Sequence, residues 1–394
     1  MDYSKLHRSC WLEIDLDSIT NNMLAIRDMV GPGIMVMPAV KANAYSHGIV
    51  ASCMALEKAG ADVLGVGSMD EAICLRENGV TMPLLVFAGN TVHEVADLYV
   101  AHNLIPTILY REQAESISRA AKKPHPVFVK IETGRGRLGV NAEECADFIR
   151  DIVTLPNIRV DGLYSHMSCA NWPDKELEYS MWQFERFDKA VKDLERGGIE
   201  IPFRQLANTP GSIAYPEIRM TGVCPGRAIW GNSPLERRPE HPDLDVALKA
   251  WKSRLVQVKE VIGGKFGEKY ATVKLDTPRR IGVMAGGLSD GISMKQAREG
   301  EVLIRGRRVP VCSPISLEHT TVDLTDCPDA VAGDEVVIMG RQGNEEIHVA
   351  ELMKRWDRSL MEVWMAIPSG MTRVYFENGA VTYIGRGETV EKIG

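Results

Sequence analysis

Long apolar runs are absent from this sequence. No stretch approaches the roughly 18 consecutive apolar residues of a membrane-spanning helix. Residues 1–9 are polar and lack the apolar core of a signal peptide. Basic residues are not in excess, because 46 Lys and Arg stand against 53 Asp and Glu, a formal net charge of -7. We therefore expect a cytoplasmic protein that binds neither membranes nor nucleic acids.

Paired cysteines and closely spaced histidines are also missing. The eight cysteines are scattered and form no Cys-x-x-Cys pair, and a chain of this size does not need disulfides for its stability. The nine histidines include no His-Glu-x-x-His pattern. We expect reduced thiols and no metal site.

The overall composition is that of a globular protein. Hydrophobic residues make up 45% and charged residues 25% of the chain, a balance without a disorder signature. The length of 394 residues is too great for one ordinary core and indicates two domains.

Short apolar segments alternate with helical patterns over the first two-thirds of the chain. The apolar segments are 34–40, 63–66, 84–88, 104–109, 127–131, 160–165, 203–207 and 220–223, and the helical patterns are 50–58, 70–78, 91–100, 112–122, 142–153 and 174–196. About eight β/α units in succession predict a parallel (β/α)8 barrel, because each crossover needs a helix outside the sheet. A doubly wound open sheet has the same periodicity and remains the alternative.

The pattern changes after Pro234. Short alternating runs separated by tight-turn residues predict hairpins over 301–311 and 374–384, and one helical pattern lies near 349–356. We expect an α/β chain with a barrel over residues 11–234. A mostly β domain follows over 235–394, together with residues 1–10.

Lys41 is the first candidate for chemistry. It directly follows the apolar segment 34–40, which places it at the carboxyl-terminal rim of a barrel strand, where barrel enzymes keep their reactive groups. A desolvated lysine there can form a Schiff base. A solvated lysine at the start of a loop would occupy the same position, so position alone does not assign a function.

Residues 41–48, KANAYSHG, resemble the cofactor-lysine motif of the alanine racemases. Further matches follow in the family's order along nearly the whole chain: WLEIDL at 11–16, the glycine-rich arginine motif ETGRGRLG at 132–139, ANT at 207–209, PG at 225–226 and VDLT at 322–325. The resemblance therefore covers both expected domains and is far more specific than one motif.

The resemblance implies a pyridoxal 5'-phosphate (PLP) enzyme with a fold-type III barrel and an amino-acid substrate. It also implies a homodimer whose active sites combine the barrel of one subunit with the second domain of the other. Lys41 would carry PLP, and the other residues implied to hold it are Tyr45, Arg137, His166, Asn208, Thr209, Cys224, Gly226 and Arg227. Hydroxyl groups and backbone N–H groups beside glycine can approach a phosphate closely.

Lys41, Arg137 and His166 are the residues to which the resemblance gives catalytic roles. Arg137 would bond the phenolic oxygen of the cofactor and lie near the substrate carboxylate, and His166, which follows the apolar segment 160–165, would lie beside the ring. Lys130 corresponds to a lysine that some members carry in carbamylated form, where it orients the arginine. Without the resemblance, Arg137 would be interpreted as a surface residue in a polar loop. A lone histidine such as His166 would be interpreted as a structural residue.

The sequence departs from the family at two chemically important positions. Leu288 stands where the family has a tyrosine, the second catalytic base. Because leucine cannot move a proton, only His166 or water could replace that base, and losing a positioned acid or base typically costs roughly 10²- to 10⁴-fold in rate. Cys224 replaces an arginine that faces the pyridine nitrogen and weakens the ring as an electron sink. A small packing residue is the ordinary alternative for a buried cysteine.

The substrate pocket is expected to differ as well. Ser369 stands in the place of another family tyrosine, and Leu317 and Glu318 replace Met-Asp. The lost side-chain volume at Leu288 and Ser369 predicts a wider, less polar pocket and a substrate larger than alanine.

Three functions remain open from the sequence. The first is a PLP-dependent racemase or epimerase that works through a carbanion at Cα. The second is a one-base PLP lyase, meaning an aldolase, a decarboxylase or a β-eliminating enzyme. The third, a non-catalytic PLP carrier, is disfavoured because carriers of this fold consist of the barrel alone.

Overall fold

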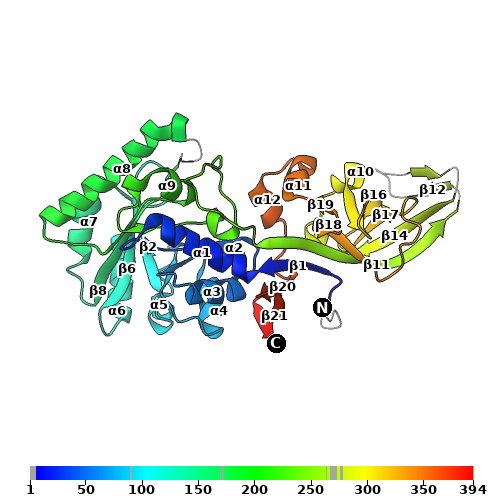
Figure 1. Cartoon of the computed structure of the whole chain (residues 1–394). Coiled ribbons are helices and arrows are strands. Elements are labelled where there is room, and N and C mark those ends of the chain that lie inside the picture. Colours follow the sequence, from blue (N-terminus) through cyan, green and yellow to red (C-terminus); the bar gives the residue numbers. More distant parts are fainter. Residues whose placement is uncertain are drawn as a thin grey trace. The chain divides into compact units, whose positions relative to one another are not determined.

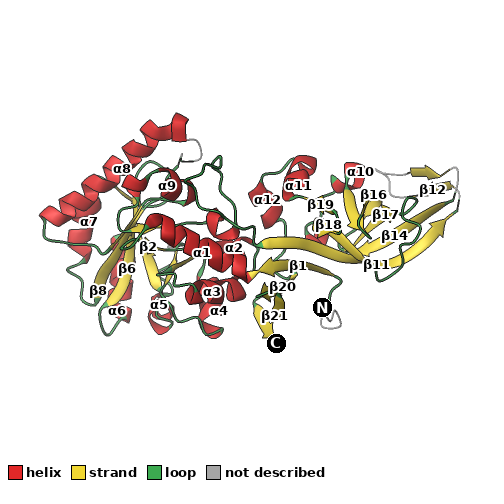
Figure 2. Cartoon of the chain, viewed as in Figure 1, coloured by secondary structure: helices red, strands yellow, loops and turns green. Residues whose placement is uncertain are grey.

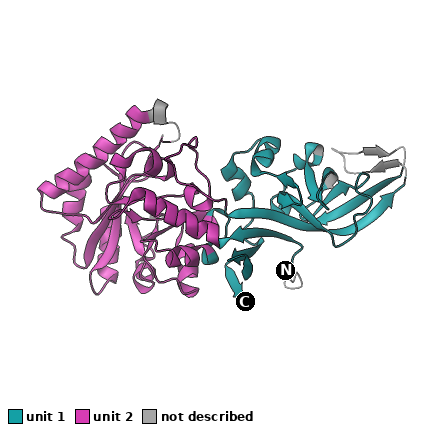
Figure 3. Cartoon of the chain, in the orientation of Figure 1, with its two compact units in different colours: residues 1–16, 45–51, 247–394 teal, residues 17–44, 52–246 magenta. Residues whose placement is uncertain are grey.

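The computed structural model describes residues 6–88, 91–168, 170, 173–262, 264–266, 273–275 and 278–393. Figure 1 follows the chain from the amino to the carboxyl terminus. The chain divides into two compact units, coloured in Figure 3. Residues 17–44 and 52–246 form the barrel unit, and residues 1–16, 45–51 and 247–394 form the β unit.

Parallel strands form the centre of the barrel unit. They run in the order β2 (Met35–Val36), β10 (Gly222–Val223), β9 (Phe203–Gln205), β8 (Ile158–Tyr164), β6 (His125–Glu132), β5 (Ile105–Ile108), β4 (Leu84–Val86) and β3 (Leu64–Val66), with β7 (Val140–Asn141) beside β6. A parallel bridge between Ala39 and Gly65 joins the two ends of this order. The sheet is therefore closed into the predicted barrel and is not an open sheet.

Helices connect the barrel strands, as a parallel sheet requires (Figure 2). They are α1 (Leu16–Val30), α2 (Lys41–Tyr45), α3 (Ile49–Lys58), α4 (Met69–Glu77), α5 (Ala96–Ala101), α6 (Arg111–Ala120), α7 (Cys145–Ile152), α8 (Pro173–Arg196) and α9 (Thr209–Ala214), with the short 3-10 turns η2 (Pro216–Ile218) and η3 (Arg227–Trp230). In α7, Cys145, Ile149 and Ile152 are buried. Their spacing of three and four residues gives the helix one apolar face.

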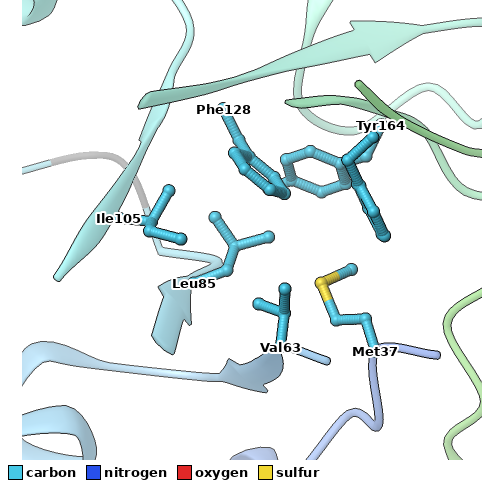
Figure 4. Close-up of a cluster of buried hydrophobic side chains, with 7 residues drawn as sticks. Met37, Val63, Leu85, Ile105, Phe128 and Tyr164 are labelled. Carbon is cyan, nitrogen blue, oxygen red and sulfur yellow. The ribbon is translucent and has the colours of Figure 1, made fainter. Parts of the chain in front are cut away.

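The barrel interior is filled by side chains from successive strands (Figure 4). The buried cluster contains Met37, Val63, Leu85, Ile105, Phe128, Tyr164 and Phe203, and Met35, Phe87 and Cys224 pack against it. Glycines make room for the aromatic rings, because a Cβ added at Gly162 would lie 2.5 Å from the Phe128 ring and one at Gly222 would lie 2.4 Å from Phe203. The core thus reaches up to Cys224, one of the candidate site residues.

A long sheet dominates the β unit. Its order is β19 (Glu345–Ile347), β18 (Glu335–Gln342), β15 (Glu301–Ile304), β16 (Arg307–Ile315), β17 (His319–Asp323), β14 (Arg279–Ala285), β11 (Leu248–Val261), β1 (Cys10–Asp15), β20 (Thr372–Glu377), β21 (Ala380–Arg386) and β22 (Thr389–Lys392). β12 (Gly264–Phe266) and β13 (Val273–Leu275) form a separate hairpin. The helices are α10 (Gln296–Glu299), α11 (Val349–Trp356) and α12 (Leu360–Met365), with the turn η4 (Leu288–Asp290).

The structure contains the predicted strands and helices, with a few differences. Both predicted hairpins form, as β15–β16 and β20–β21. The helix expected over 91–100 begins only at Ala96, because the residues before it form turns. β1, which the sequence assigned to the barrel from residue 11 onward, belongs to the β unit. This unit starts again at Ala247, whereas the sequence placed the boundary after Pro234. Among the described helices, none has both the length and the apolar character needed to cross a membrane.

Candidate active site

Lys41 lies at the carboxyl end of the first barrel strand, two residues after the bridge at Ala39. Its Nζ atom lies 5.9 Å from the centroid of the Phe87 ring. Burial lowers the pKa of this amine, and the positive charge of Arg137 lowers it further. A lowered pKa increases the neutral, nucleophilic fraction of the amine, as the predicted chemistry of Lys41 requires.

The segment α2 is not a right-handed helix, because a left-handed turn (residues 42–46) follows this lysine. Ala42, Asn43, Ala44, Tyr45 and Ser46 all have positive φ angles, between 53° and 68°. This conformation costs roughly 1–2 kcal/mol for each residue with a Cβ, so it must be held by its surroundings.

Glu71, in the first turn of α4, holds the beginning of the left-handed turn. Its two carboxylate oxygens accept the backbone N–H groups of Asn43 at 2.8 Å and Gly67 at 2.7 Å. Gly67 in turn lies directly against Lys41, since an added Cβ would be 3.0 Å from the Cβ of Lys41. One carboxylate therefore links the turn after the candidate cofactor lysine to the backbone of Gly67, which packs against that lysine.

The structure brings five predicted site residues together at the carboxyl ends of the barrel strands. This barrel-mouth cluster contains Lys41, Lys130, Arg137, His166 and Cys224, each of which interacts electrostatically with others of the set. Three of the five are cationic side chains. A concentration of positive charge of this kind favours an anionic ligand.

Lys130 is almost entirely buried in β6, with 6% of its surface exposed. Burial lowers its pKa to about 8, and Arg137 and Lys41 contribute to the shift. Its Nζ atom lies 4.8 Å from the centroid of the Tyr164 ring, and the Tyr164 hydroxyl bonds the Thr107 hydroxyl at 2.7 Å. The lysine therefore lies over an aromatic ring, whose face attracts the charged form of the amine.

His166 follows β8 and is held in the neutral form. Burial lowers its pKa to about 3, with further lowering by Arg137, Lys41 and Lys130. The segment after β8 is fixed by the buried Gln183 of α8, whose Oε1 accepts the N–H of Ser168 at 2.8 Å. His166 is thus a weak base in a fixed position.

Glu132 organises the loop that carries Arg137. Its carboxylate accepts the backbone N–H groups of Gly134 at 2.5 Å and Arg137 at 2.9 Å. Burial alone would raise the pKa of this carboxyl, but the N–H groups of the loop together lower it below its usual range. The Tyr179 hydroxyl donates to the carbonyl of Gly134 at 2.8 Å, so the loop is held from both sides.

The two turns that carry Thr209 and Gly226, both residues implied to hold PLP, are neighbours. The Cys224 N–H donates to the carbonyl of Ala207 at 2.9 Å. The Thr209 hydroxyl oxygen accepts the N–H groups of Gly226 at 3.0 Å and Ala228 at 3.3 Å. Because the oxygen already accepts two bonds, the hydroxyl proton points elsewhere and can be donated.

Asn208 and Arg227 flank these turns. Asn208 caps α9 by accepting the N–H of Gly211 at 3.2 Å, and its side-chain amide donates to the carbonyl of Met167 at 3.4 Å. Arg227 begins η3 directly after Gly226. The Asn208 side chain thus forms hydrogen bonds within the protein, and its bond to Met167 connects the turn of Thr209 to the segment that carries His166.

The remaining predicted residues lie in the β unit. Leu288 and Leu317 are 39% and 66% exposed and sit on adjacent loops, joined by the bond from the Leu288 N–H to the Ser316 carbonyl at 2.9 Å. Tyr45 and Ser369 both lie near the buried Arg373, which donates to the carbonyls of Ser46 and Ser369 at 2.9 and 2.8 Å. The β unit therefore presents two separate pairs of candidate residues.

Comparison with known proteins identifies the family. Residues 14–234 match the alanine racemase N-terminal domain and residues 248–375 match the alanine racemase C-terminal domain.

The chain belongs to the alanine racemase family.

Relatives support this membership over the full length. The chain is 34% identical to the alanine racemase of Desulfosudis oleivorans, covering 96% of this chain and 99% of the relative, and 31% identical to that of Halothermothrix orenii, covering 94% and 98%. Among solved structures, alanine racemase from Clostridium difficile 630 has a TM-score of 0.87 at 28% identity, covering 97% of this chain and 99% of that one. The Bacillus anthracis alanine racemase with bound L-Ala-P has a TM-score of 0.86 at 27% identity, with 97% and 98% covered.

Alanine racemases are PLP-dependent isomerases, and the residues of this chain fit that cofactor. A lysine whose pKa is lowered can bond an aldehyde, the cationic barrel-mouth cluster suits an anionic group, and the Thr209 hydroxyl has a proton to donate. Each of these features belongs to the barrel unit.

Sequence reasoning missed the residues that hold the site in place. Glu71, Glu132, Gln183 and Arg373 act through backbone groups, and nothing in their spacing distinguishes them from surface residues. Glu132 alone carried a signal, because it directly precedes a glycine-rich loop whose N–H groups need an acceptor.

Proposed function

We propose that this chain is an amino-acid racemase or epimerase of the alanine racemase family that acts on a substrate larger than alanine. The observation that carries the proposal is the pair of adjacent exposed leucines, Leu288 and Leu317, in the β unit. Leu288 takes the place of the family's second catalytic tyrosine. A substrate side chain that is bulky and apolar would bury both leucines and gain roughly 25 cal/mol for each Å² of apolar surface removed from water.

Lys41 is proposed as the cofactor lysine and the principal base. PLP, when bound there, withdraws electrons from the substrate Cα and so allows a substituent to leave that carbon. The lowered pKa of Lys41 increases the fraction of its amine that is neutral and can accept the Cα proton. Arg137, held by Glu132, would bond the phenolic oxygen of the cofactor and orient the substrate carboxylate.

The phosphate would be held by hydroxyl and backbone N–H donors. The Thr209 hydroxyl and the backbone of Arg227 would supply donors from the two neighbouring turns. The Gly226 N–H, which donates to the Thr209 hydroxyl oxygen at 3.0 Å, would exchange that bond for one to the phosphate. Tyr45 would supply a hydroxyl from the left-handed turn. Asn208 supports these turns by its cap of α9. Lys130, whose pKa is about 8, would carry a carbamate that orients Arg137.

A one-base lyase is the second candidate, and two observations favour it. His166 has a pKa of about 3, which makes it a poor replacement for the missing tyrosine as a base at neutral pH. Burial raises the pKa of the Cys224 thiol to about 12, so a neutral group stands where the family has a cation. Retro-aldol cleavage, decarboxylation and β-elimination can each proceed with Lys41 as the only strong base.

One experiment separates the two candidates. The holoenzyme is incubated in D₂O with a panel of L- and D-amino acids, and chirality, deuterium at Cα, aldehyde and CO₂ are followed. Interconversion of enantiomers, fastest for bulky substrates, supports the racemase. Exchange with retention of configuration, or cleavage products, supports the lyase, and alanine as the best substrate would contradict the enlarged pocket.

Leu288→Tyr tests the missing base directly. A tyrosine at this position restores a hydroxyl that can transfer a proton, so racemisation should rise by roughly 10²-fold. Leu317→Tyr is the matched control, because it places the same side chain on the adjacent loop. Equal racemisation rates in the parent and the Leu288→Tyr enzyme would contradict the missing-base interpretation.

The proposal includes a cytoplasmic homodimer with shared active sites. Its support is the exposure of Leu288 and Leu317, two large apolar side chains on hydrogen-bonded segments of the β unit. Sedimentation at micromolar concentration should give twice the chain mass.

A further inference from the structure

Arg373 is one of the largest fully buried side chains of the chain, with 1% of its surface exposed. It lies in β20, and its guanidinium donates to the carbonyls of Ser46 at 2.9 Å, Ser369 at 2.8 Å, Met371 at 2.7 Å and Pro368 at 3.3 Å. All four acceptors are backbone oxygens. They belong to only two segments, the turn after the cofactor lysine and the loop that carries Ser369.

The turn after Lys41 is packed closely within the β unit, to which residues 45–51 belong (Figure 3). The Ser46 hydroxyl donates to the carbonyl of Trp364 at 2.7 Å, and the His47 ring meets the Trp364 ring edge-on at 5.0 Å. A Cβ added to Gly48 would lie 1.8 Å from the Tyr375 hydroxyl and 2.8 Å from Cδ of Arg373. Arg373 therefore contacts the turn by packing as well as by hydrogen bonding.

A buried guanidinium constrains its acceptors. Burying a charge is costly unless its donors are bonded, and its fork of N–H groups has a fixed planar geometry. Carbonyl oxygens from two segments can accept these planar N–H groups together only when the two segments hold one fixed position relative to each other. A shift of either the turn or the loop would leave charged donors without acceptors.

We propose that Arg373 is a positioning residue that couples the phosphate-binding turn of Tyr45 to the substrate-pocket loop of Ser369. Loss of the Arg373 guanidinium allows both the turn and the loop to move. It therefore weakens phosphate recognition and alters the substrate pocket at the same time. This inference rests on the proposed function, because it assigns Tyr45 to the cofactor phosphate.

The test compares the dissociation constants of PLP and pyridoxal, which lacks the phosphate, measured by absorbance titration of the apoenzyme. Arg373→Lys keeps the charge but cannot reach two segments at once. We expect PLP to bind about tenfold more weakly while pyridoxal binding is unchanged, in line with the loss of one or two charge-assisted bonds. Arg280→Lys is the matched control, since Arg280 also donates to a backbone carbonyl of the β unit, that of Ala330 at 2.8 Å.

Tyr45→Phe serves as the reference for phosphate recognition, and the KM for the amino acid gives a second readout. Arg373→Lys should reproduce the PLP-selective loss of Tyr45→Phe and also raise KM. Equally weakened binding of PLP and pyridoxal would show a merely structural role and overturn the inference. A lower melting temperature with an unchanged ratio of the two dissociation constants would do the same. If borohydride reduction with PLP leaves no label on Lys41, the proposed function fails, and the positioning role fails with it.

Discussion

Lys130 shows how burial alters a single side chain. It is 6% exposed, and its pKa of about 8 lies well below that of a solvated lysine. Above this pH the amine is neutral and can bond CO₂ to form a carbamate. Below it, the amine is protonated and unreactive.

Carbamylation of Lys130 should therefore depend on pH. In ¹³C-bicarbonate, we expect a carbamate signal in the NMR spectrum above about pH 8, and its loss as the pH falls below that value. Lys130→Arg should remove the signal without affecting exposed lysines. A signal that persists in that variant would assign the carbamate to another residue.

At the level of residues, the sequence predicted the positions of the candidate catalytic residues better than it predicted the residues that support them. Lys41 and His166 follow apolar segments, so their place at the barrel rim could be inferred from the strand pattern. The carbonyl acceptors of Arg373 could not, because backbone oxygens carry no sequence signal and those of Ser46 and Ser369 lie far apart in the chain.

The loop between β6 and β7 depends on one carboxylate. Glu132 accepts N–H groups from Gly134 and Arg137, and these bonds hold its pKa below the usual range despite burial. A carboxyl with a lowered folded-state pKa stabilises the fold above its unfolded pKa, and this contribution is lost as the pH falls through the folded value.

Glu132→Gln should therefore lower the free energy of unfolding at pH 7 by about 1 kcal/mol, because the amide accepts N–H bonds more weakly. The difference should shrink as the pH falls through the lowered pKa of the parent carboxyl. Urea unfolding at pH 7 and at a series of lower pH values measures it, with the exposed Glu185→Gln as control. A difference that stays constant over the series would contradict the role of the charge.

At the level of elements, periodicity predicted the alternating strands and helices but not how they close. The bridge between Ala39 and Gly65 distinguishes the barrel from an open sheet, and it depends on tertiary packing that no local pattern encodes. The left-handed turn escaped prediction for a similar reason, since its alanines have no preference for positive φ.

The proposed sharing of active sites between subunits makes a prediction for the whole molecule. If each site combines two subunits, a chain with Lys41→Ala and a chain with Leu288→Asp, each inactive alone, should form hybrid dimers with one intact site. Random mixing then restores about a quarter of the parent activity. Native mass spectrometry verifies the hybrids, and hybrids without activity would show that each subunit builds its own site.

The β unit gathers three distant parts of the chain, and this has a consequence for synthesis on the ribosome. β1 pairs with β11 and, in parallel, with β20, and the turn after Lys41 bonds Arg373 in β20. Contacts between such distant residues form slowly. The amino-terminal strand therefore gains its first partner only when β11 has been translated and its second only when β20 emerges, and the turn beside the candidate cofactor lysine is completed only at that last stage.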